Sequence, residues 1–261
     1  MDAPVLDAKT VIAKRVAQEV KPGTLVNLGI GLPSMVANHL APDVHVFIQA
    51  ENGEIGRGAR PPEGMEDPDL TDAGGGFVSA VPGAASIDSA MSFGLIRGGH
   101  LDMTVLGGLQ VDARGYLANW MVPGKMVPGM GGAMDLVAGA KRVIVAMVHT
   151  AKGSPKIVPE CTLPLTAMRR VSLIVTEMAV IEPTDAGLVL RERGPGVSVD
   201  EIRAATSAEL TVGGDIKEMT LRWKSRPRAR LPSSPARSPS PQRPTPINAE
   251  RGPHKSPIST T

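Results

Sequence analysis

Cysteine and aromatic residues are scarce in this sequence. The single cysteine, Cys161, excludes an internal disulfide and a zinc site made of several cysteines. It favours a reducing compartment, so we expect a cytoplasmic protein in which Cys161 is an inert core residue. With only 2% aromatic residues, the core must be built from Val, Ile, Leu, Met and Ala. The 29 glycines and 24 prolines predict many tight turns.

Long hydrophobic runs are also lacking. No apolar run reaches the roughly 18 residues that a membrane-spanning helix needs, so no membrane span is expected. The opening residues MDAPVLDAKTVIAKRV carry early acidic residues and no apolar core, so they predict a helix and not a signal peptide. The 261 residues, 42% of them hydrophobic, are enough for one large α/β domain or two small ones.

The positive charge of the chain is confined to its C-terminal segment. The net charge is +2, but residues 222–261 hold nine Lys or Arg and one acidic residue, Glu250, a balance of +8, which leaves residues 1–221 at −6. The segment also has nine Pro, seven Ser and almost no apolar periodicity, which is typical of a disordered chain. We therefore predict a folded domain over residues 1–221 and a disordered basic tail over residues 222–261. The folded domain is not expected to bind nucleic acid or a membrane surface.

Segments typical of strands alternate with segments typical of helices. Helices are predicted over residues 8–20, 86–95, 133–138 and 199–207, and another after the Gly29-Ile30-Gly31 turn, with Pro33 at its first position. Ser198 and Glu201 form a capping box for the last of these helices. Strands are predicted at TLVNL before that turn and at residues 44–49, buried on both faces, 77–81, 103–106, 143–148 and 173–176. The alternation predicts an α/β fold with an open, mostly parallel sheet flanked by helices.

Two segments carry residues that suit a catalytic site. Glu51 follows a predicted buried strand and precedes an Asn-Gly turn, so its carboxylate is expected at the carboxyl edge of the sheet, where open α/β folds place their sites. An ordinary solvated loop glutamate is the competing interpretation. In PGKMVPGMGGAMDL, residues 123–136, glycines precede a helix, and their backbone N–H groups can converge on an oxyanion or phosphate. A turn with no ligand explains this segment equally well.

Over residues 5–221 the sequence resembles the B subunit of family I coenzyme A transferases of the succinyl-CoA:3-oxoacid type. The matching segments occur in order along the chain: KPGTLVNLGIGLP, AENG, SFGLIRGGHLDMTVLGGLQVD, LANWMVPGKMVPGMGGAMDLVAGA, PKIVPECTLPLT and GPGVSVDEI. The resemblance implies the CoA-transferase (NagB/RpiA-like) fold. It also implies that Glu51 is the catalytic nucleophile, with Ala50 in the place of the usual serine. The segment from Glu54 to Gly58 departs from the family's aliphatic pattern and adds charges near the site.

The resemblance implies a ping-pong transfer of coenzyme A from succinyl-CoA to a 3-oxoacid such as acetoacetate or 3-oxoadipate. Glu51 would carry a glutamyl-CoA thioester between the two half-reactions. Gly131 or Gly132 would supply N–H groups to the oxyanion, and Asn52 would position the carboxylate or serve only the turn. The coenzyme A thioester is the substrate, and no separate cofactor is expected. A separate A subunit is implied, in an assembly expected to be α2β2.

Other functions remain open from the sequence. Acyl-CoA hydrolysis, or transfer to acetate or another short acid, would use the same scaffold. A non-catalytic subunit whose basic tail recruits RNA or an acidic protein is a further alternative, and a tail without a role, from an altered reading frame, is another. The five histidines show no metal-ligand spacing, so no metal site is expected. The Gly29-Ile30-Gly31 turn lacks the third glycine of a dinucleotide motif, and Ser86 and Ser92 lack a nucleophile elbow.

Overall fold

The computed structural model describes residues 6–41, 44–58, 60–124 and 129–221. The chain divides into two units, Met1–Lys224 and Ser225–Thr261. The second unit lies outside the described residues, and so do the predicted basic tail and the predictions that concern it.

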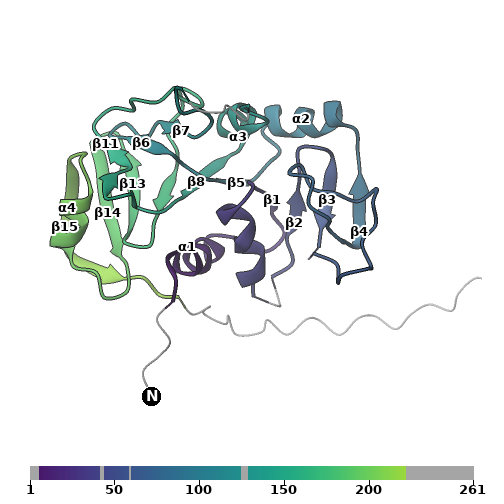
Figure 1. Ribbon diagram of the computed structural model, residues 1–261, viewed down its shortest axis with the longest axis horizontal. Helices are drawn as coiled ribbons and strands as arrows, with labels where there is room; N and C mark the ends of the chain where they lie inside the picture. The colour runs from purple at the N-terminus through teal and green to yellow at the C-terminus, as the bar shows by residue number, and fades with distance from the viewer. Residues whose placement is uncertain (1–5, 42–43, 59, 125–128, 222–261) are drawn as a thin grey trace, which may run out of the picture. The chain divides into compact units, whose positions relative to one another are not determined.

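A ten-stranded sheet runs through the described domain (Figure 1). Its order is β15-β14-β13-β12-β8-β5-β1-β2-β3-β4. The five central strands, from β12 to β2, are parallel, and antiparallel pairs flank them on both sides. The strands are β1 (Leu25–Leu28), β2 (Phe47–Gln49), β3 (Glu54–Arg57), β4 (Ala80–Ser86), β5 (Met103–Leu106), β8 (Arg142–Ala146), β12 (Leu173–Val175), β13 (Ala179–Thr184), β14 (Gly187–Arg193) and β15 (Leu210–Glu218).

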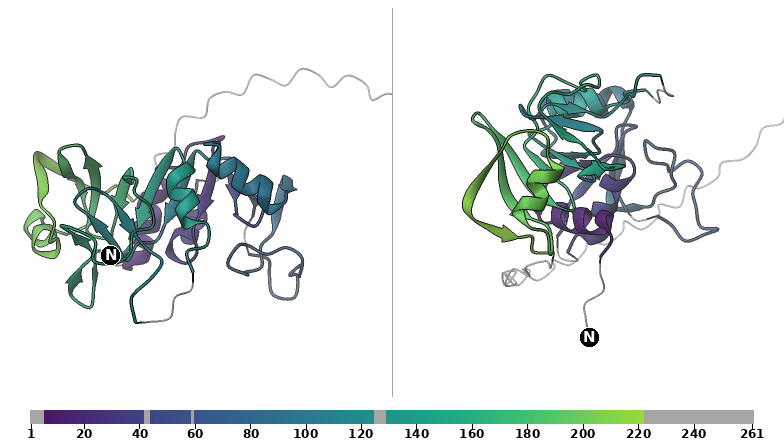
Figure 2. Two further views of the ribbon diagram at one scale, coloured as in Figure 1. Left: turned by 90° about the horizontal axis from the view of Figure 1, so that it is seen from above. Right: turned by 60° about the vertical axis from the view of Figure 1, so that its left-hand side comes forward.

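Helices cover both faces of the parallel strands (Figures 1 and 2). The helices are α1 (Ala8–Ala17), the 3-10 helix η1 (Leu32–His39), α2 (Ser89–Arg97), α3 (Ala133–Gly139) and α4 (Val199–Ala205). Helix α1 and η1 pack on one face, and α2 and α3 lie on the other. The predicted α/β fold, with its mostly parallel sheet flanked by helices, is confirmed.

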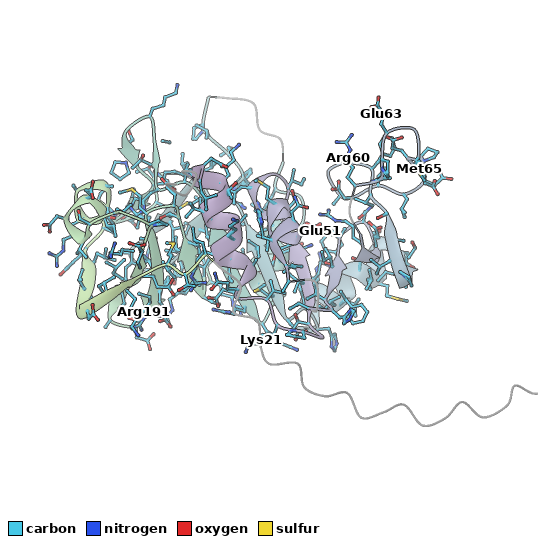
Figure 3. All side chains as sticks on the ribbon, turned by 90° about the horizontal axis from the view of Figure 1, so that it is seen from below. Lys21, Glu51, Arg60, Glu63, Met65 and Arg191 are labelled. Carbon is cyan, nitrogen blue, oxygen red and sulfur yellow. The ribbon has the colours of Figure 1, made fainter. Side chains whose placement is uncertain are left out.

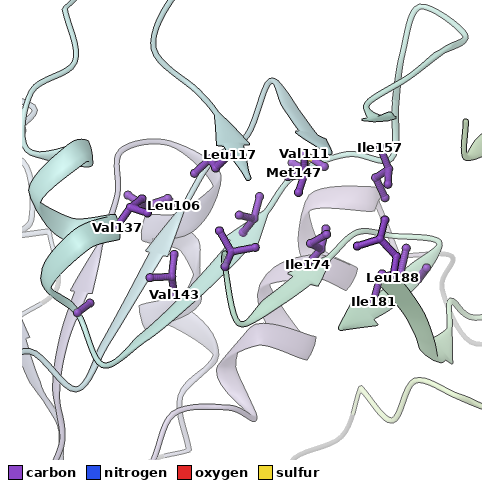
Figure 4. Close-up of a cluster of buried hydrophobic side chains, with 14 of the residues drawn as sticks. Leu106, Val111, Leu117, Val137, Val143, Met147, Ile157, Ile174, Ile181 and Leu188 are labelled. Carbon is purple, nitrogen blue, oxygen red and sulfur yellow. The ribbon is translucent and has the colours of Figure 1, made fainter. Parts of the chain in front are cut away.

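The central strands alternate their side chains between two buried cores, as the period of two along a strand requires. In β8, Val143 and Val145 join the core beneath α2 and α3 (Figure 4), whereas Ile144 packs on the opposite face against the α1 core. In β12, Ile174 likewise joins the core beneath α2 and α3, and Leu173 packs in the α1 core on the opposite face. Burial on both faces explains why these strands appear in the sequence as continuous apolar runs.

Local signals fix several helix ends. Asp7 caps α1, because its Oδ1 accepts a hydrogen bond from the Thr10 N–H. The predicted capping box of α4 is present, with the Ser198 and Glu201 side chains each bonded to the other's backbone. The helix after the Gly29-Ile30-Gly31 turn begins near Pro33 as predicted, but it is a 3-10 helix.

Two strand predictions need correction. The strand predicted over residues 77–81 lies instead at Ala80–Ser86, most of β4 is exposed, and Phe77 makes only an isolated bridge with Thr71. The strand predicted over residues 44–49 is shortened to Phe47–Gln49, and Phe47 is about half exposed. Both segments lie in or near the antiparallel end of the sheet. An apolar segment there is not necessarily covered by other elements on both faces, so apolar composition alone does not predict the bounds of a strand.

Strands β3, β13, β14 and β15 of the large sheet were not among those predicted, and neither were five short strands that complete the domain. The short strands are β6 (Gln110–Asp112), β7 (Leu117–Ala118), β9 (Thr150–Ala151), β10 (Ser154–Pro155) and β11 (Ile157–Val158), and β11, β6 and β7 form a small sheet of their own. Within the described ranges, no helix is long and apolar enough to cross a membrane.

Candidate active site

Glu51 occupies the tight turn that joins β2 to β3 at the carboxyl edge of the parallel strands. The Ala50 N–H donates to the Glu54 carbonyl, and the Gly53 N–H donates back to the Ala50 carbonyl at 3.0 Å. Gly53 has φ +114°, and a Cβ there would stand 1.8 Å from the Ile87 carbonyl oxygen, so only glycine fits. The backbone conformation of the turn is therefore fixed, and this fixes the position of the Glu51 Cβ.

Gly132 approaches Glu51 from the segment before α3. A Cβ on residue 132 would lie 2.8 Å from Glu51 Cγ, 3.3 Å from its Oε1 and 3.4 Å from Phe93 Cζ of α2. The structure thus brings together two of the predicted site residues that are far apart in the sequence. Gly131, beside them, has φ +54°, and its N–H and that of Gly132 have no backbone acceptor among the described residues.

Glu51 is half-buried, and its position on the domain is labelled in Figure 3. A small pocket with a volume of about 60 Å³ opens beside it. It is enclosed by three segments, the Gly29-Ile30-Gly31 turn after β1, the Ala50-Glu51 turn after β2 and the 72–74 loop, together with Arg57 of β3. No described residue donates a hydrogen bond to the Glu51 carboxylate. Both carboxylate oxygens of Glu51 are therefore available to bind or react with a ligand in this pocket.

A buried chain of polar side chains lies beneath the Glu51 turn. Thr104 of β5 donates to Asn27 Oδ1, and Asn27 of β1 donates to Gln49 Oε1 of β2, each at 3.2 Å. Gln49 Nε2 then donates to Ser92 Oγ at 2.7 Å and to the Ala50 carbonyl at 2.9 Å. All four side chains are essentially inaccessible to solvent. The network ends on the residue before Glu51 and holds the turn against the sheet.

The sequence contains a signal for this network that our prediction did not use. Asn27, Gln49 and Thr104 interrupt apolar strands with polar side chains, and buried polar groups are kept in folded proteins when they are hydrogen-bonded. Ser92, which lacks the setting of a nucleophile, is part of the same support.

Two charged residues, Arg57 of β3 and Asp72 of the loop after it, line the same pocket. Arg57 Nη1 donates to Asp72 Oδ2 at 3.0 Å, while Asp72 Oδ1 accepts from the N–H groups of Gly74 and Gly76. Glu54, at the start of β3, is 5% exposed, and neither of its carboxylate oxygens has a hydrogen-bond partner among the described residues. Burial raises the pKa of Glu54, opposed by the nearby Arg57 and reinforced by Asp72.

Helices α2 and α3 are tied together next to Gly132. Arg97 Nε of α2 donates to Asp135 Oδ1 of α3 at 2.7 Å, and the Arg97 guanidinium lies 5.4 Å from the centre of the Phe93 ring. The Arg97 side chain is largely exposed, so solvent screening leaves this pair with little effect on stability. Its effect is geometric, because it links the helix that carries Phe93 to the segment that carries Gly132.

Asn52 is the remaining predicted site residue, and Cys161 is the residue expected to be inert. The Asn52 amide donates to the Thr71 carbonyl at 2.7 Å, which joins the turn to the loop before β4. Its role toward an oxyanion or coenzyme A stays a prediction. Cys161 is partly buried, and burial raises the pKa of its thiol to about 12, so it stays protonated at neutral pH.

The architecture and the sequence both match known proteins. A family model described as coenzyme A transferase covers residues 9–205. The chain belongs to the coenzyme A transferase family. It is 55% identical over 212 residues to the beta subunit of the acetate CoA-transferase of Escherichia coli (strain K12), covering 81% of this chain and 97% of that protein. It is 49% identical to the B subunit of the succinyl-CoA:3-ketoacid coenzyme A transferase of Helicobacter pylori, covering 78% of this chain and 99% of that protein.

Solved structures share the transferase fold at lower sequence identity. An acyl-CoA transferase from Escherichia coli O157:H7 aligns with a TM-score of 0.66 and 23% identity over 85% of this chain, which spans 44% of that longer chain. Glutaconate coenzyme A-transferase from Acidaminococcus fermentans aligns with a TM-score of 0.60 and 18% identity, covering 84% of this chain and 93% of that one. These structures share the fold, and the closer sequence relatives identify this transferase chain as one of the B, or beta, type.

Proposed function

We propose that this transferase chain moves coenzyme A from succinyl-CoA to a 3-oxoacid through a covalent intermediate on Glu51. The observation that carries the proposal is the position of Glu51 in a glycine-fixed turn at the sheet edge, next to Gly132 and a pocket. Its carboxylate accepts no hydrogen bond from the residues that the structure describes. The relative from Helicobacter pylori, named as the B subunit of a succinyl-CoA:3-ketoacid transferase, supports the choice of substrates.

In the first half-reaction, a Glu51 carboxylate oxygen attacks the thioester carbonyl of the acyl-CoA. The carbon–sulfur bond breaks, and a mixed acyl-glutamyl anhydride and a CoA thiolate result. The thiolate then attacks the Glu51 carbonyl carbon of the anhydride and releases the donor acid as a carboxylate. The product is a glutamyl-CoA thioester, which retains the free energy of the original thioester, so no separate cofactor is needed.

The second half-reaction runs these steps in reverse with the acceptor acid. Each addition places negative charge on a carbonyl oxygen next to the Glu51 side chain. Gly131 and Gly132 offer backbone N–H groups there, and such a contact contributes about 10²- to 10³-fold to a rate. The buried network that ends on the Ala50 carbonyl keeps Glu51 in place during both additions.

The proposal includes a partner A subunit. Relatives that this chain covers almost completely are named as beta or B subunits, whereas the chain spans only 41% of a mouse mitochondrial succinyl-CoA:3-ketoacid transferase at 47% identity. We propose a heteromer, of α2β2 composition, in the cytoplasm. Mass photometry of the co-expressed pair would show its stoichiometry.

A different acceptor is the second candidate. The 55% identity to one chain of an acetate CoA-transferase favours acetate or another short acid. The two candidates are separated by comparing acetate, acetoacetate and 3-oxoadipate as acceptors with one acyl-CoA donor. A hydrolase would instead release free CoA with no acceptor present.

The covalent step is tested on the complex formed with the A subunit. Incubation with succinyl-CoA without acceptor should add the mass of CoA, less one water, to the peptide that contains Glu51. Glu51→Gln should abolish both this adduct and turnover, because an amide cannot act as the nucleophile or carry the acyl group. Glu63→Gln, on the exposed loop after β3 (Figure 3), is the matched control and should retain both. Native turnover by Glu51→Gln would disprove the proposal.

A further inference from the structure

We propose that Arg57 makes the acyl site selective for acids that carry a second carboxylate, by binding that distal carboxylate with its guanidinium. The inference rests on the proposed function of Glu51 and deepens it, because it names the class of acid transferred. It predicts that dicarboxylic acyl groups such as succinyl, and acceptors such as 3-oxoadipate, are preferred over monocarboxylic acids of similar length.

Arg57 is the one cationic side chain among the described residues that line the Glu51 pocket. The other charged groups there are the carboxylates of Glu51 and Asp72. An acyl group with its own carboxylate would therefore enter an anionic pocket unless a cation received it. Arginine suits this task, because its planar guanidinium offers several donors that match a carboxylate.

The guanidinium retains the capacity to bind a second anion. Its side chain is 11% exposed, and Nη1 is bonded to Asp72. Nε is buried and has no hydrogen-bond partner among the described residues. A buried donor without a partner costs free energy, and a shift of the guanidinium that brought Nε to a bound carboxylate would remove that cost. The other oxygen of Asp72 accepts from two loop N–H groups, so Asp72 is itself held in place. It therefore orients Arg57 through Nη1 and leaves the other guanidinium N–H groups without a bond to Asp72.

Room for the distal part of a substrate lies next to Arg57. A larger hollow of about 880 Å³ shares Arg57 and Asp72 with the Glu51 pocket, so the ion pair stands where the two spaces adjoin. Arg60, on the loop after β3 (Figure 3), lines this larger hollow and adds a second positive charge. The reacting carbonyl can lie at Glu51 in the small pocket while the far end of the acid reaches the guanidinium.

The competing explanation is purely structural. The Arg57–Asp72 pair could serve only to hold the loop from residue 72 to 76 in place. That role would affect all acyl groups alike, whereas recognition of a distal carboxylate would affect only acids that have one. The ratio of two substrates measured on one variant therefore separates the two explanations.

The test uses the complex with its A subunit and measures the donor half-reaction alone. The rate of CoA adduct formation on Glu51 is followed by rapid quenching and mass spectrometry, with succinyl-CoA and butyryl-CoA as donors. Arg57→Met should lower the succinyl-to-butyryl rate ratio roughly 10- to 100-fold, the effect of losing a charge-assisted hydrogen bond. Arg57→Lys, which keeps the charge, should restore part of the ratio.

Asp72→Asn provides an independent variant. The asparagine Oδ1 can still accept from Gly74 and Gly76, but its amide no longer neutralises Arg57, so the succinyl-to-butyryl ratio should rise several-fold. An unchanged ratio in Arg57→Met, even with both rates reduced, would overturn the inference, and so would a lower ratio in Asp72→Asn. If the unsubstituted complex forms no adduct on Glu51 from either donor, it is the proposed function that fails.

Discussion

The Gly132 backbone packs directly against the Glu51 side chain, so closely that a single added methyl group would stand 2.8 Å from Glu51 Cγ. This contact joins the end of β2 to the start of α3, and it sets the position of a carboxylate that has no hydrogen-bond donor among the described residues. It makes residue 132 a sensitive point for testing the site.

Gly132→Ala should reduce kcat of the assembled enzyme by roughly 10²-fold, because the new Cβ displaces Glu51 from its position. The φ of −80° at Gly132 accepts alanine, so the thermal unfolding midpoint should change little. Gly94→Ala is the control. Gly94 lies in α2 with nothing within 4 Å of an added Cβ, and alanine there should stabilise by up to about 1 kcal/mol without altering kcat. Full activity in Gly132→Ala would show that Glu51 has room to move.

Gln49→Met should weaken catalysis by loosening the turn that carries Glu51. Methionine keeps the volume but removes the donors to the Ala50 carbonyl and Ser92 Oγ, so we expect a loss of about 1–3 kcal/mol in the free energy of unfolding. kcat should fall more than KM rises. Gln110→Met, which also removes hydrogen bonds but at the distant Thr162 loop, should leave kcat intact. Equal kcat values in the two variants would argue against a positioning role.

His149 should make the protein less stable in acid. The side chain is fully buried between Thr176 and Thr206, and burial lowers its pKa from 6.5 to about 4. Because the unfolded chain binds the proton more tightly, the free energy of unfolding should fall as pH drops from about 6.5 to 4, by about 3 kcal/mol in total. Urea unfolding across this pH range measures the change. The free energy of unfolding should decline fully in His45→Gln, the control at an exposed position, and less in His149→Gln.

Glu54→Met should stabilise the protein at neutral pH. The buried carboxylate lacks hydrogen-bond partners among the described residues, and its pKa is raised, so its ionisation is penalised in the folded state. This contribution weakens the fold as pH rises above the unfolded pKa of 4.5, which is opposite in sign to that of His149. The gain, about 1–3 kcal/mol at pH 7, should shrink toward pH 4.5. Glu63→Met, at an exposed position, should show no such trend in the same denaturation series.

Some parts of the fold were accessible from sequence because the signal is local. β5 was predicted with its observed bounds, since a run buried on both faces needs apolar residues at nearly every position. The capping box at Ser198 was equally clear, because both partners lie within one helical turn. The displacement of the strand expected at residues 77–81 shows the limit. An apolar segment forms a strand only where a neighbouring strand can pair with its backbone, and β3 pairs with Ala80–Ser86.

The sequence by itself determined the family, the alternation of strands and helices, and Glu51 as the candidate nucleophile, because these are read from ordered motifs and local periodicity. Only the tertiary structure decided which groups meet Glu51. Strand register aligns Asn27 with Gln49 and Thr104, a close approach brings Gly132 to the carboxylate, and a loop returns Asp72 to Arg57. Such contacts join segments far apart in the chain, and they exist only once the sheet has assembled and its neighbours have packed.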